Sequence, residues 1–313
     1  MEGVLIIDKA AGMTSHDVVA RARRILRERR IGHTGTLDPF ATGVLVLLVG
    51  RATRLAQFHA GADKEYEAVI RLGVATDTGD IAGSPLSATR VTATQINWTD
   101  KEIRTALEQL CGEITQVPPM HSAKKYGGKK LYELARRGEE IERAPICVTI
   151  HALEPTTTTD QLLKDNFDGT VDLGVRVVCS AGTYVRTLAE DFGKLLGVGA
   201  HLAELRRMRA GDFHVKDSTT LEQLQQLVEE GSLGTILLPP DAALSRMPFV
   251  HLSTANAQKA RHGIALSLAA SPWLDGEKVR MKDENDRLIG IGYYDSANQL
   301  LHPGVVLASQ NTV

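Results

Sequence analysis

The most informative stretch of the chain is Gly32-His33-Thr34-Gly35-Thr36-Leu37-Asp38-Pro39-Phe40-Ala41-Thr42-Gly43-Val44-Leu45. It places one carboxylate, Asp38, in a turn rich in glycine and threonine, directly before a proline. Pro39 fixes its own φ and favours an extended backbone at Asp38. The apolar residues 44–49 that follow are typical of a buried strand. A single Asp-Pro turn usually bonds only its own backbone, but so long a specified segment indicates an acid held in a rigid loop for chemistry.

Length and composition predict a globular chain with one large and one small domain, or two of middle size. The chain has 313 residues, of which 43% are hydrophobic and 4% aromatic, so a surface built mainly on base stacking is not expected. No apolar run approaches the ~20 residues of a membrane-spanning helix, and residues 1–7 show no basic n-region or cleavage site, so we expect no signal sequence. The three cysteines form no CxxC motif, which argues against disulfides or zinc. We therefore expect a soluble cytoplasmic protein.

The charge distribution is more informative than the formal net charge of −2. Residues 1–60 carry 9 Lys and Arg against 5 Asp and Glu, and residues 121–145 carry 7 against 4. Screening acts over about 8 Å at physiological salt, so a local basic patch is felt locally whatever the total charge. The arginine-rich run 21–30 is by itself more typical of a solvated helix face than of an RNA contact.

Strand and helix patterns are mixed along the chain without regular βαβ alternation, which favours an α+β fold. Capping boxes at Thr14 and Thr99 open two helices, the second ending at Gly112. Further patterns predict strands at 4–7, 64–72, 146–153 and 171–180, and helices at 183–196 and 221–230.

The run 237–240, Leu-Leu-Pro-Pro, is typical of a domain boundary. Beyond it the pattern predicts one helix at 254–262 and strands at 278–281, 288–294 and 300–307. A turn at 283–286 would make the first two strands a hairpin. We therefore expect a larger domain at 1–240 and a small β-rich domain at 241–313.

The segment 32–45 resembles the signature of the TruB-type tRNA pseudouridine synthases, which isomerise uridine 55 in the T-arm of tRNA. The resemblance implies a pseudouridine synthase fold, with a mixed, mainly antiparallel sheet, and a small C-terminal domain similar to the PUA RNA-binding domain. It places the nucleophilic aspartate of the family at Asp38. It places at His33 the histidine that fills the room left in the RNA stack by the extruded nucleotide. No second histidine lies near His33 in sequence, so we expect no metal site there.

Three more residues match the family's motifs. Arg186, in Ser180-Ala181-Gly182-Thr183-Tyr184-Val185-Arg186, is the matching arginine; a nucleophilic Asp38 must be ionised, so we expect this cation to hold its pKa down. An ordinary pairing of Arg186 with Glu190 is the alternative. Tyr66 matches a tyrosine that stacks on the target uracil, and Leu205 an apolar residue on the far side of the base. By position alone, both would be core residues.

The remaining matches concern support and RNA contact. Lys9 matches a lysine that supports the catalytic loop, although Ala10 stands where the family usually has a proline. Residues 115–140 match an insertion that clasps the tRNA arm, and Lys129 and Lys130 within it suit phosphate contact. We include Arg29 and Arg30 of the arginine-rich run as further RNA-contact candidates.

These matches predict an enzyme that isomerises uridine 55 with a flipped base. Nothing is oxidised and no group is imported, so we expect no cofactor and no metal. The expected partner is the T-arm of tRNA, bound by a monomer that is not attached to a membrane. Asp38 could attack C6 of the base or C1′ of the ribose, and Tyr66 could accept the C5 proton or only stack.

Three other functions are compatible with parts of the sequence. An Asp-dependent phosphatase or phosphotransferase is the alternative enzyme, but no carboxylate stands two residues after Asp38 to hold Mg²⁺. A tRNA-folding chaperone with incidental catalysis would use the same RNA contacts. A related synthase acting on other RNA would share the core.

Overall fold

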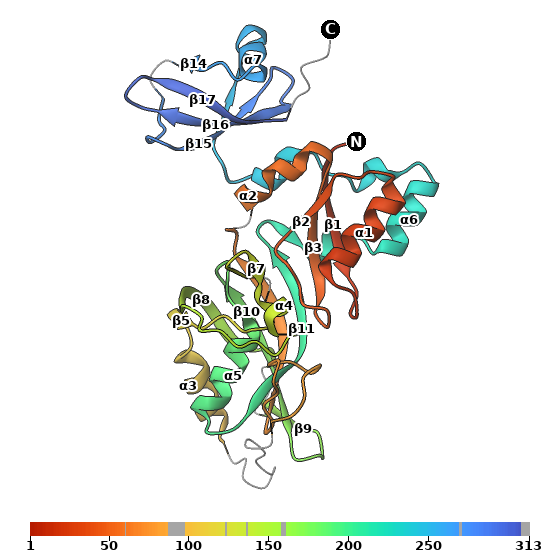
Figure 1. Cartoon of the computed structure of the whole chain (residues 1–313), viewed down its shortest axis with the longest axis vertical. Coiled ribbons are helices and arrows are strands. Elements are labelled where there is room, and N and C mark those ends of the chain that lie inside the picture. The colour runs from red at the N-terminus through yellow and green to blue at the C-terminus, as the bar shows by residue number, and fades with distance from the viewer. Residues whose placement is uncertain are drawn as a thin grey trace.

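The computed structural model describes residues 1–59, 61–86, 98–122, 124–135, 137–157, 161–268 and 271–307, without the side chains of residues 125, 126, 129, 130 and 132. The backbone in these ranges forms a large sheet, a smaller C-terminal sheet and a short hairpin (Figure 1).

The large sheet has ten strands in the described ranges, with the continuous order β1-β3-β11-β4-β10-β8-β5. Strand β2 pairs with β3, β12 with β11, and β9 with β10. All of these pairings are antiparallel except that of β3 with β11, which confirms the mixed, mainly antiparallel α+β prediction. The strands are β1 (Gly3–Lys9), β2 (Ile31–Thr34), β3 (Thr42–Val49), β4 (Lys64–Leu72), β5 (Gly112–Gln116), β8 (Ile146–Pro155), β9 (Leu163–Asp165), β10 (Val171–Cys179), β11 (Ala200–Ala210) and β12 (Phe213–His214).

Helices cover the large sheet in two groups. Figure 1 shows α1 and α6 beside β1 and β3, and α3 and α5 at the other end of the same sheet. Among the described residues, no helix combines the length and apolar character needed to cross a membrane. The helices of this domain are α1 (Ser15–Leu26), α2 (Ala56–His59), α3 (Asp100–Glu108), α4 (Leu131–Ala135), α5 (Val185–Leu195) and α6 (Leu221–Glu229), with 3₁₀ helices η1 (Gly50–Leu55), η4 (Val215–Asp217), η5 (Leu233–Thr235) and η6 (Pro240–Leu244).

Strands β1 and β3 are buried on both faces, which explains their unbroken apolar sequences. Leu5 and Leu47 point into the main core with α1 and α6. Val4, Val46 and Leu48 point the other way, into a second apolar cluster formed with η1, η6 and the C-terminal domain. The strand that ends the Asp38 loop is therefore held from both sides.

The structure confirms the two predicted helix starts, but the predicted end of one helix is wrong. Thr14 and Thr99 each form a reciprocal capping box, with Asp17 and Glu102 respectively. The second helix ends at Glu108, and Gly112, with φ +88°, opens strand β5 instead. Gly112 therefore lies in the turn that leads into a strand. In the sequence, a glycine in such a turn looks the same as a glycine that ends a helix.

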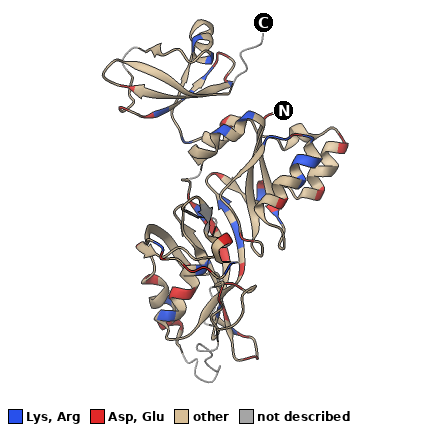
Figure 2. Ribbon diagram, in the orientation of Figure 1, with Lys and Arg blue, Asp and Glu red and all other residues tan. Residues whose placement is uncertain are grey.

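Strand β11 lies in the middle of the large sheet and is missing from the predicted elements. It pairs with β4 along its length and with β3 at Arg206 and Arg207. Its arginines and two irregularities in register obscure the alternation that marks a half-buried strand. Figure 2 shows these basic positions running along β11 through the middle of the molecule.

The C-terminal sheet has the strand order β13-β15-β16-β17-β14, with α7 (Thr254–Arg261) packed against it. The predicted hairpin is confirmed by the antiparallel pairing of β15 with β16. Its strands are β13 (Phe249–His251), β14 (Leu266–Ser267), β15 (Lys278–Lys282), β16 (Leu288–Asp295) and β17 (Leu300–Val306). The division at 240/241 stays a prediction.

Substitution of Gly43 tests how closely strands β3 and β11 approach each other. An added Cβ at Gly43 would lie 2.2 Å from the Arg207 carbonyl oxygen, whereas one at Gly12 would meet nothing within 4 Å. Both glycines have positive φ. Gly12→Ala should therefore cost only backbone strain, about 1–2 kcal/mol, and Gly43→Ala about 1–3 kcal/mol more. Urea unfolding measures both; equal losses would contradict this close approach.

Candidate active site

The loop that carries Asp38 is fixed by hydrogen bonds from two other segments. Ser15, at the start of α1, accepts from the Leu37 amide (2.9 Å) and donates to the Leu37 carbonyl (3.1 Å). The buried Lys9 ammonium lies under the loop and donates to the carbonyls of Pro39 (3.1 Å) and Ala41 (2.6 Å) as well as to that of Ala10. Lys9 thus binds three carbonyls, two of them in the Asp38 loop; its role as the support of that loop stays a prediction.

Arg186 is paired with Asp38, as the motif resemblance predicted, and not with Glu190. Its Nε lies 2.9 Å from Asp38 Oδ2 and its Nη2 3.1 Å from Asp38 Oδ1, which makes the contact bidentate. Arg186 is only 4% exposed. Its position early in α5 is unfavourable for a cation against the helix dipole, and carboxylates offset that cost.

Backbone oxygens and a second carboxylate complete the surroundings of Arg186. Its Nη1 donates to the Thr78 carbonyl (3.0 Å) and lies 3.5 Å from Asp80 Oδ2. Its Nη2 also donates to the His121 carbonyl (2.7 Å). The guanidinium therefore joins three segments of the chain around Asp38, and its orientation is fixed.

The electrostatic balance at Asp38 differs from the expected one. Burial raises the pKa of the Asp38 carboxyl above its ordinary value, and the nearby Asp80 adds to this, while Arg186 and Lys9 lower it only in part. The expectation that a cation would hold this pKa below its ordinary value is therefore wrong in direction. Desolvation at the loop outweighs the ion pair.

A pocket of about 270 Å³ opens beside Asp38. Four of the predicted site residues line it: Asp38, Tyr66, Arg186 and Leu205. Tyr66 comes from β4 and Leu205 from the adjacent β11, where the two strands pair. The other lining residues are Gly35, Thr36, Leu37, Lys64, Ser122, Lys124, Ser180, Gly182, Thr183, Tyr184, Val185 and Arg207.

Tyr66 is buried, with 8% of its surface exposed. Burial raises the pKa of its phenol, and the Arg207 guanidinium acts in the opposite direction. The side chain is therefore a neutral phenol at neutral pH. It offers a flat aromatic wall with a hydroxyl at its edge.

Arg207 and Asp80 belong to the pocket region and were not predicted as site residues. The buried Arg207 donates from Nε to the Val44 carbonyl (2.7 Å) and from Nη2 to the Gly35 carbonyl (2.8 Å), so it ties the two ends of the Asp38 loop to β11. Asp80 lies in the turn after β4, beside Arg186. The Thr-Asp-Thr-Gly-Asp turn was the available signal for Asp80; Arg207 had none, because the strand that carries it was not predicted.

Besides Lys9, five predicted residues lie away from the pocket lining or outside the described side chains. His33, in β2, has its Nε2 3.2 Å from Thr36 Oγ1. Its ring meets the His16 ring edge-on, with the ring centres 5.3 Å apart. His16 was not predicted as a neighbour, because it lies far from His33 in sequence. Arg29 and Arg30 are exposed, in the turn after α1 ends at Leu26. The side chains of Lys129 and Lys130 lie outside the described part.

Ser122 and Lys124, at the base of the insertion, line the pocket. Strands β6 (Lys125–Tyr126) and β7 (Lys129–Lys130) form its hairpin. Gln116 joins it to α5, donating to the Tyr184 carbonyl (3.3 Å) and accepting from the Tyr184 amide (3.0 Å). Within the described ranges, no group of three or more His, Cys, Asp or Glu side chains could hold a metal ion.

Three family models match the chain in succession. Residues 23–185 match the TruB family pseudouridylate synthase (N terminal domain), and residues 186–245 the tRNA pseudouridylate synthase B C-terminal domain. Residues 248–307 match Pseudouridine synthase II TruB, C-terminal.

Curated proteins and a solved structure are similar over nearly the whole chain. A tRNA pseudouridine synthase B of Dechloromonas aromatica (strain RCB) is 46% identical over 93% of this chain and 91% of its own. One of Geobacillus thermodenitrificans (strain NG80-2) is 42% identical over 92% and 93%. A chain of the crystal structure of a Cbf5-Nop10-Gar1 complex is 26% identical, with a TM-score of 0.74, over 98% of this chain and 85% of that chain.

The Lys9 ammonium provides a test of the loop's support. Burial lowers its pKa from 10.5 to about 8, although Asp38 acts in the opposite direction. In a ¹³C-lysine-labelled protein followed by NMR, the signal lost in Lys9→Met should titrate with a midpoint near 8. A midpoint near 10.5 for that signal would contradict the burial of this amine under the loop.

Proposed function

The chain belongs to the TruB family of pseudouridylate synthases, and we propose that it converts uridine 55 in the T-arm of tRNA to pseudouridine with Asp38 as nucleophile. The names of the relatives support tRNA as the RNA that is modified. The observation that carries the choice of Asp38 is its bidentate contact with Arg186 at the wall of the pocket.

The isomerisation breaks the bond from C1′ of the ribose to N1 of uracil and forms one from C1′ to C5. The C5 proton leaves and N1 gains a proton, so atoms and electrons balance without an oxidant, and the proposal needs no cofactor or metal. Asp38 forms a covalent bond during this exchange, either at C6 of the base or at C1′ of the ribose. Both routes require the carboxylate form.

The surroundings of Asp38 suit a nucleophile. The bidentate Arg186 contact favours the carboxylate and fixes the direction of its oxygens. Burial at the same time makes that carboxylate less stable than one in water, which the raised pKa reflects. A carboxylate that is poorly solvated gains more on forming a covalent bond.

The pocket supports base flipping. Its volume of about 270 Å³ suits one nucleotide rather than a base pair, and an enzyme that acts on a base must take it out of the stack. Tyr66 and Leu205 would lie against the base, and the raised pKa of Tyr66 favours stacking over service as a phenolate base. His33, outside the pocket lining, would occupy the space left in the RNA stack.

RNA contact beyond the pocket is assigned to three regions. The insertion at 115–140 would clasp the T-arm, and Arg29 and Arg30 would contact phosphates. The domain at 241–313 would add RNA contacts of the PUA kind. We propose that the protein acts in the cytoplasm, where its proposed substrate is found, and that it acts as a monomer.

Replacing Asp38 separates catalysis from RNA binding. Asp38→Asn keeps the shape of the side chain but cannot form the covalent bond, so release of tritium from tRNA labelled at uridine C5 should cease. Binding of tRNA should stay within about threefold, or ~0.7 kcal/mol. Asp17→Asn, in the nearby capping box, is the control for loss of one acidic charge.

Retained tritium release in Asp38→Asn would contradict the nucleophile. Chemical mapping of pseudouridine in total tRNA after incubation with the wild-type protein locates the product. Product elsewhere than position 55 would favour a synthase for other RNA. A folding chaperone with incidental catalysis would be favoured if Asp38→Asn retained the full effect of the wild type on tRNA folding.

Charge reversal tests the proposed phosphate contacts. Arg29→Glu with Arg30→Glu, or Lys129→Glu with Lys130→Glu, should weaken tRNA binding, and each lost contact should reduce the slope of log K against log salt by about 1. Lys101→Glu with Arg104→Glu, on the exposed face of α3, changes the charge equally and should leave the slope unchanged. An unchanged slope in both test variants would contradict these contacts.

A further inference from the structure

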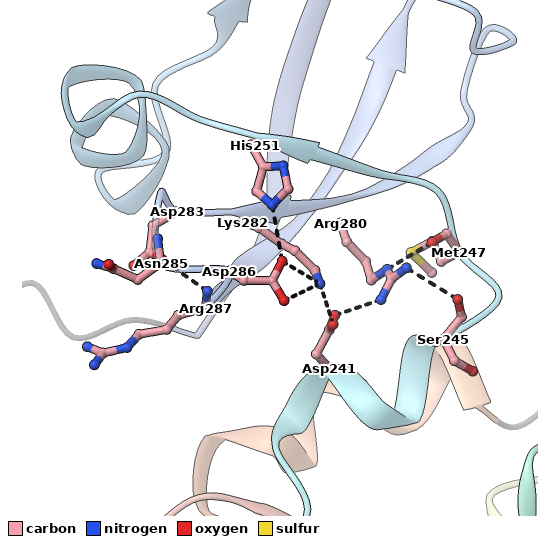
Figure 3. A network of polar contacts seen from close by, with 10 residues as sticks. All are labelled: Asp241, Ser245, Met247, His251, Arg280, Lys282, Asp283, Asn285, Asp286 and Arg287. Atoms are coloured by element: carbon pink, nitrogen blue, oxygen red, sulfur yellow. Dashed lines mark hydrogen bonds and ion pairs between the residues drawn. The ribbon is translucent and has the colours of Figure 1, made fainter.

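The segment 240–247 joins the two sheets and is attached to both. Ala243 and Leu244 are buried in the apolar cluster that joins Val4 and Leu48 of the large sheet to Ile291 and Val305 of the C-terminal sheet. Polar groups of the same segment contact the C-terminal sheet, as Figure 3 shows. The segment is therefore a bridge with one apolar and one polar side.

Asp241 is the centre of the polar side. Its Oδ1 lies 2.9 Å from Arg280 Nη1 and its Oδ2 2.7 Å from Lys282 Nζ, so one carboxylate binds two cations of β15 (Figure 3). Arg280 also donates from Nε to the Met247 carbonyl (2.8 Å) and from Nη2 to the Ser245 carbonyl (3.2 Å). Arg280 thus uses all three of its nitrogens on the bridge.

Both cations are removed from water. Arg280 is 7% and Lys282 6% exposed, and both lie over the Phe249 ring, at 5.4 and 5.0 Å from its centre. Lys282 has a second carboxylate partner in Asp286, which belongs to its own domain. Hence Asp241 is the carboxylate that connects these cations to the bridge.

The two sides of the bridge contribute differently to domain orientation. Apolar packing of Ala243 and Leu244 holds the parts together but is not directional. Charge-assisted hydrogen bonds to a guanidinium are short and directional. Asp241 therefore supplies directional contacts that orient the C-terminal sheet on the bridge, beside the Ser245 and Met247 carbonyls that also accept from Arg280.

We propose that Asp241 is a positioning residue for the modification of full-length tRNA, because it holds the C-terminal domain where one RNA molecule can contact it and the Asp38 pocket together. Figure 1 shows the C-terminal sheet at the end of the molecule opposite α3 and α5, the latter carrying Arg186. RNA in the pocket reaches that sheet only if it extends well beyond the target base. The inference rests on the proposed function.

The test compares two substrates. For Asp241→Asn, KM for full-length tRNA should rise about fivefold or more, with kcat within about twofold, because the buried charges lose their partner. KM for an isolated T-arm stem-loop should not change. Asp241→Glu retains the charge and should restore part of the affinity, and Asp295→Asn, on β16 but away from the bridge, is the matched control.

Small-angle X-ray scattering supplies a readout independent of catalysis: the distance distribution of Asp241→Asn should broaden. An unchanged KM for tRNA, an equal change with both substrates, or an unchanged scattering profile overturns the inference. If Asp241→Asn does not fold, Asp241→Glu decides through the same comparison, with an intermediate KM expected. A wild-type protein that leaves tRNA unmodified refutes the proposed function instead, and the scattering result still decides whether Asp241 orients the domain.

Discussion

The contact between Asp38 and Arg186 holds together parts of the chain that are far apart in sequence. Through Arg186, the Asp38 loop is connected to the turn that bears Thr78 and Asp80, and to the His121 carbonyl at the base of the insertion. A buried guanidinium needs partners for its donors, so these segments must meet wherever α5 places it. The pocket is the space left between them.

Burial has two opposite effects on the ion pair between Asp38 and Arg186. It strengthens the ion pair, because few waters compete for the Arg186 guanidinium. It also raises the pKa of Asp38 and so reduces the stability of the charged form. Lys9 and Arg207 contribute positive charge and also bind the carbonyls of the loop. The loop is thus kept rigid by residues whose positive charge also lies near its half-buried carboxylate, as expected where a reactive group must be preorganised.

The same principle recurs where the two domains meet. Asp241 compensates Arg280 and Lys282, just as Asp38 and Asp80 compensate Arg186. In both places apolar packing brings the segments together and an ion pair with a buried arginine adds directional contacts. Pocket chemistry and domain orientation therefore depend on separate carboxylates that can be changed independently.

Local patterns in the sequence were sufficient for the helix starts at Thr14 and Thr99, for strands β1, β3, β4 and β10, and for the hairpin of β15 and β16, because capping and alternation are properties of neighbouring residues. The motifs also predicted Asp38, Tyr66, Arg186 and Leu205 as site residues, and all four line one pocket. Strand β11, the roles of Arg207 and Asp80, the nearness of His16 to His33 and the rise in the pKa of Asp38 were decided only by the tertiary structure. Each of these features depends on which distant segment packs against the residue and on how much water that segment excludes. Neither can be read from the spacing of neighbouring residues.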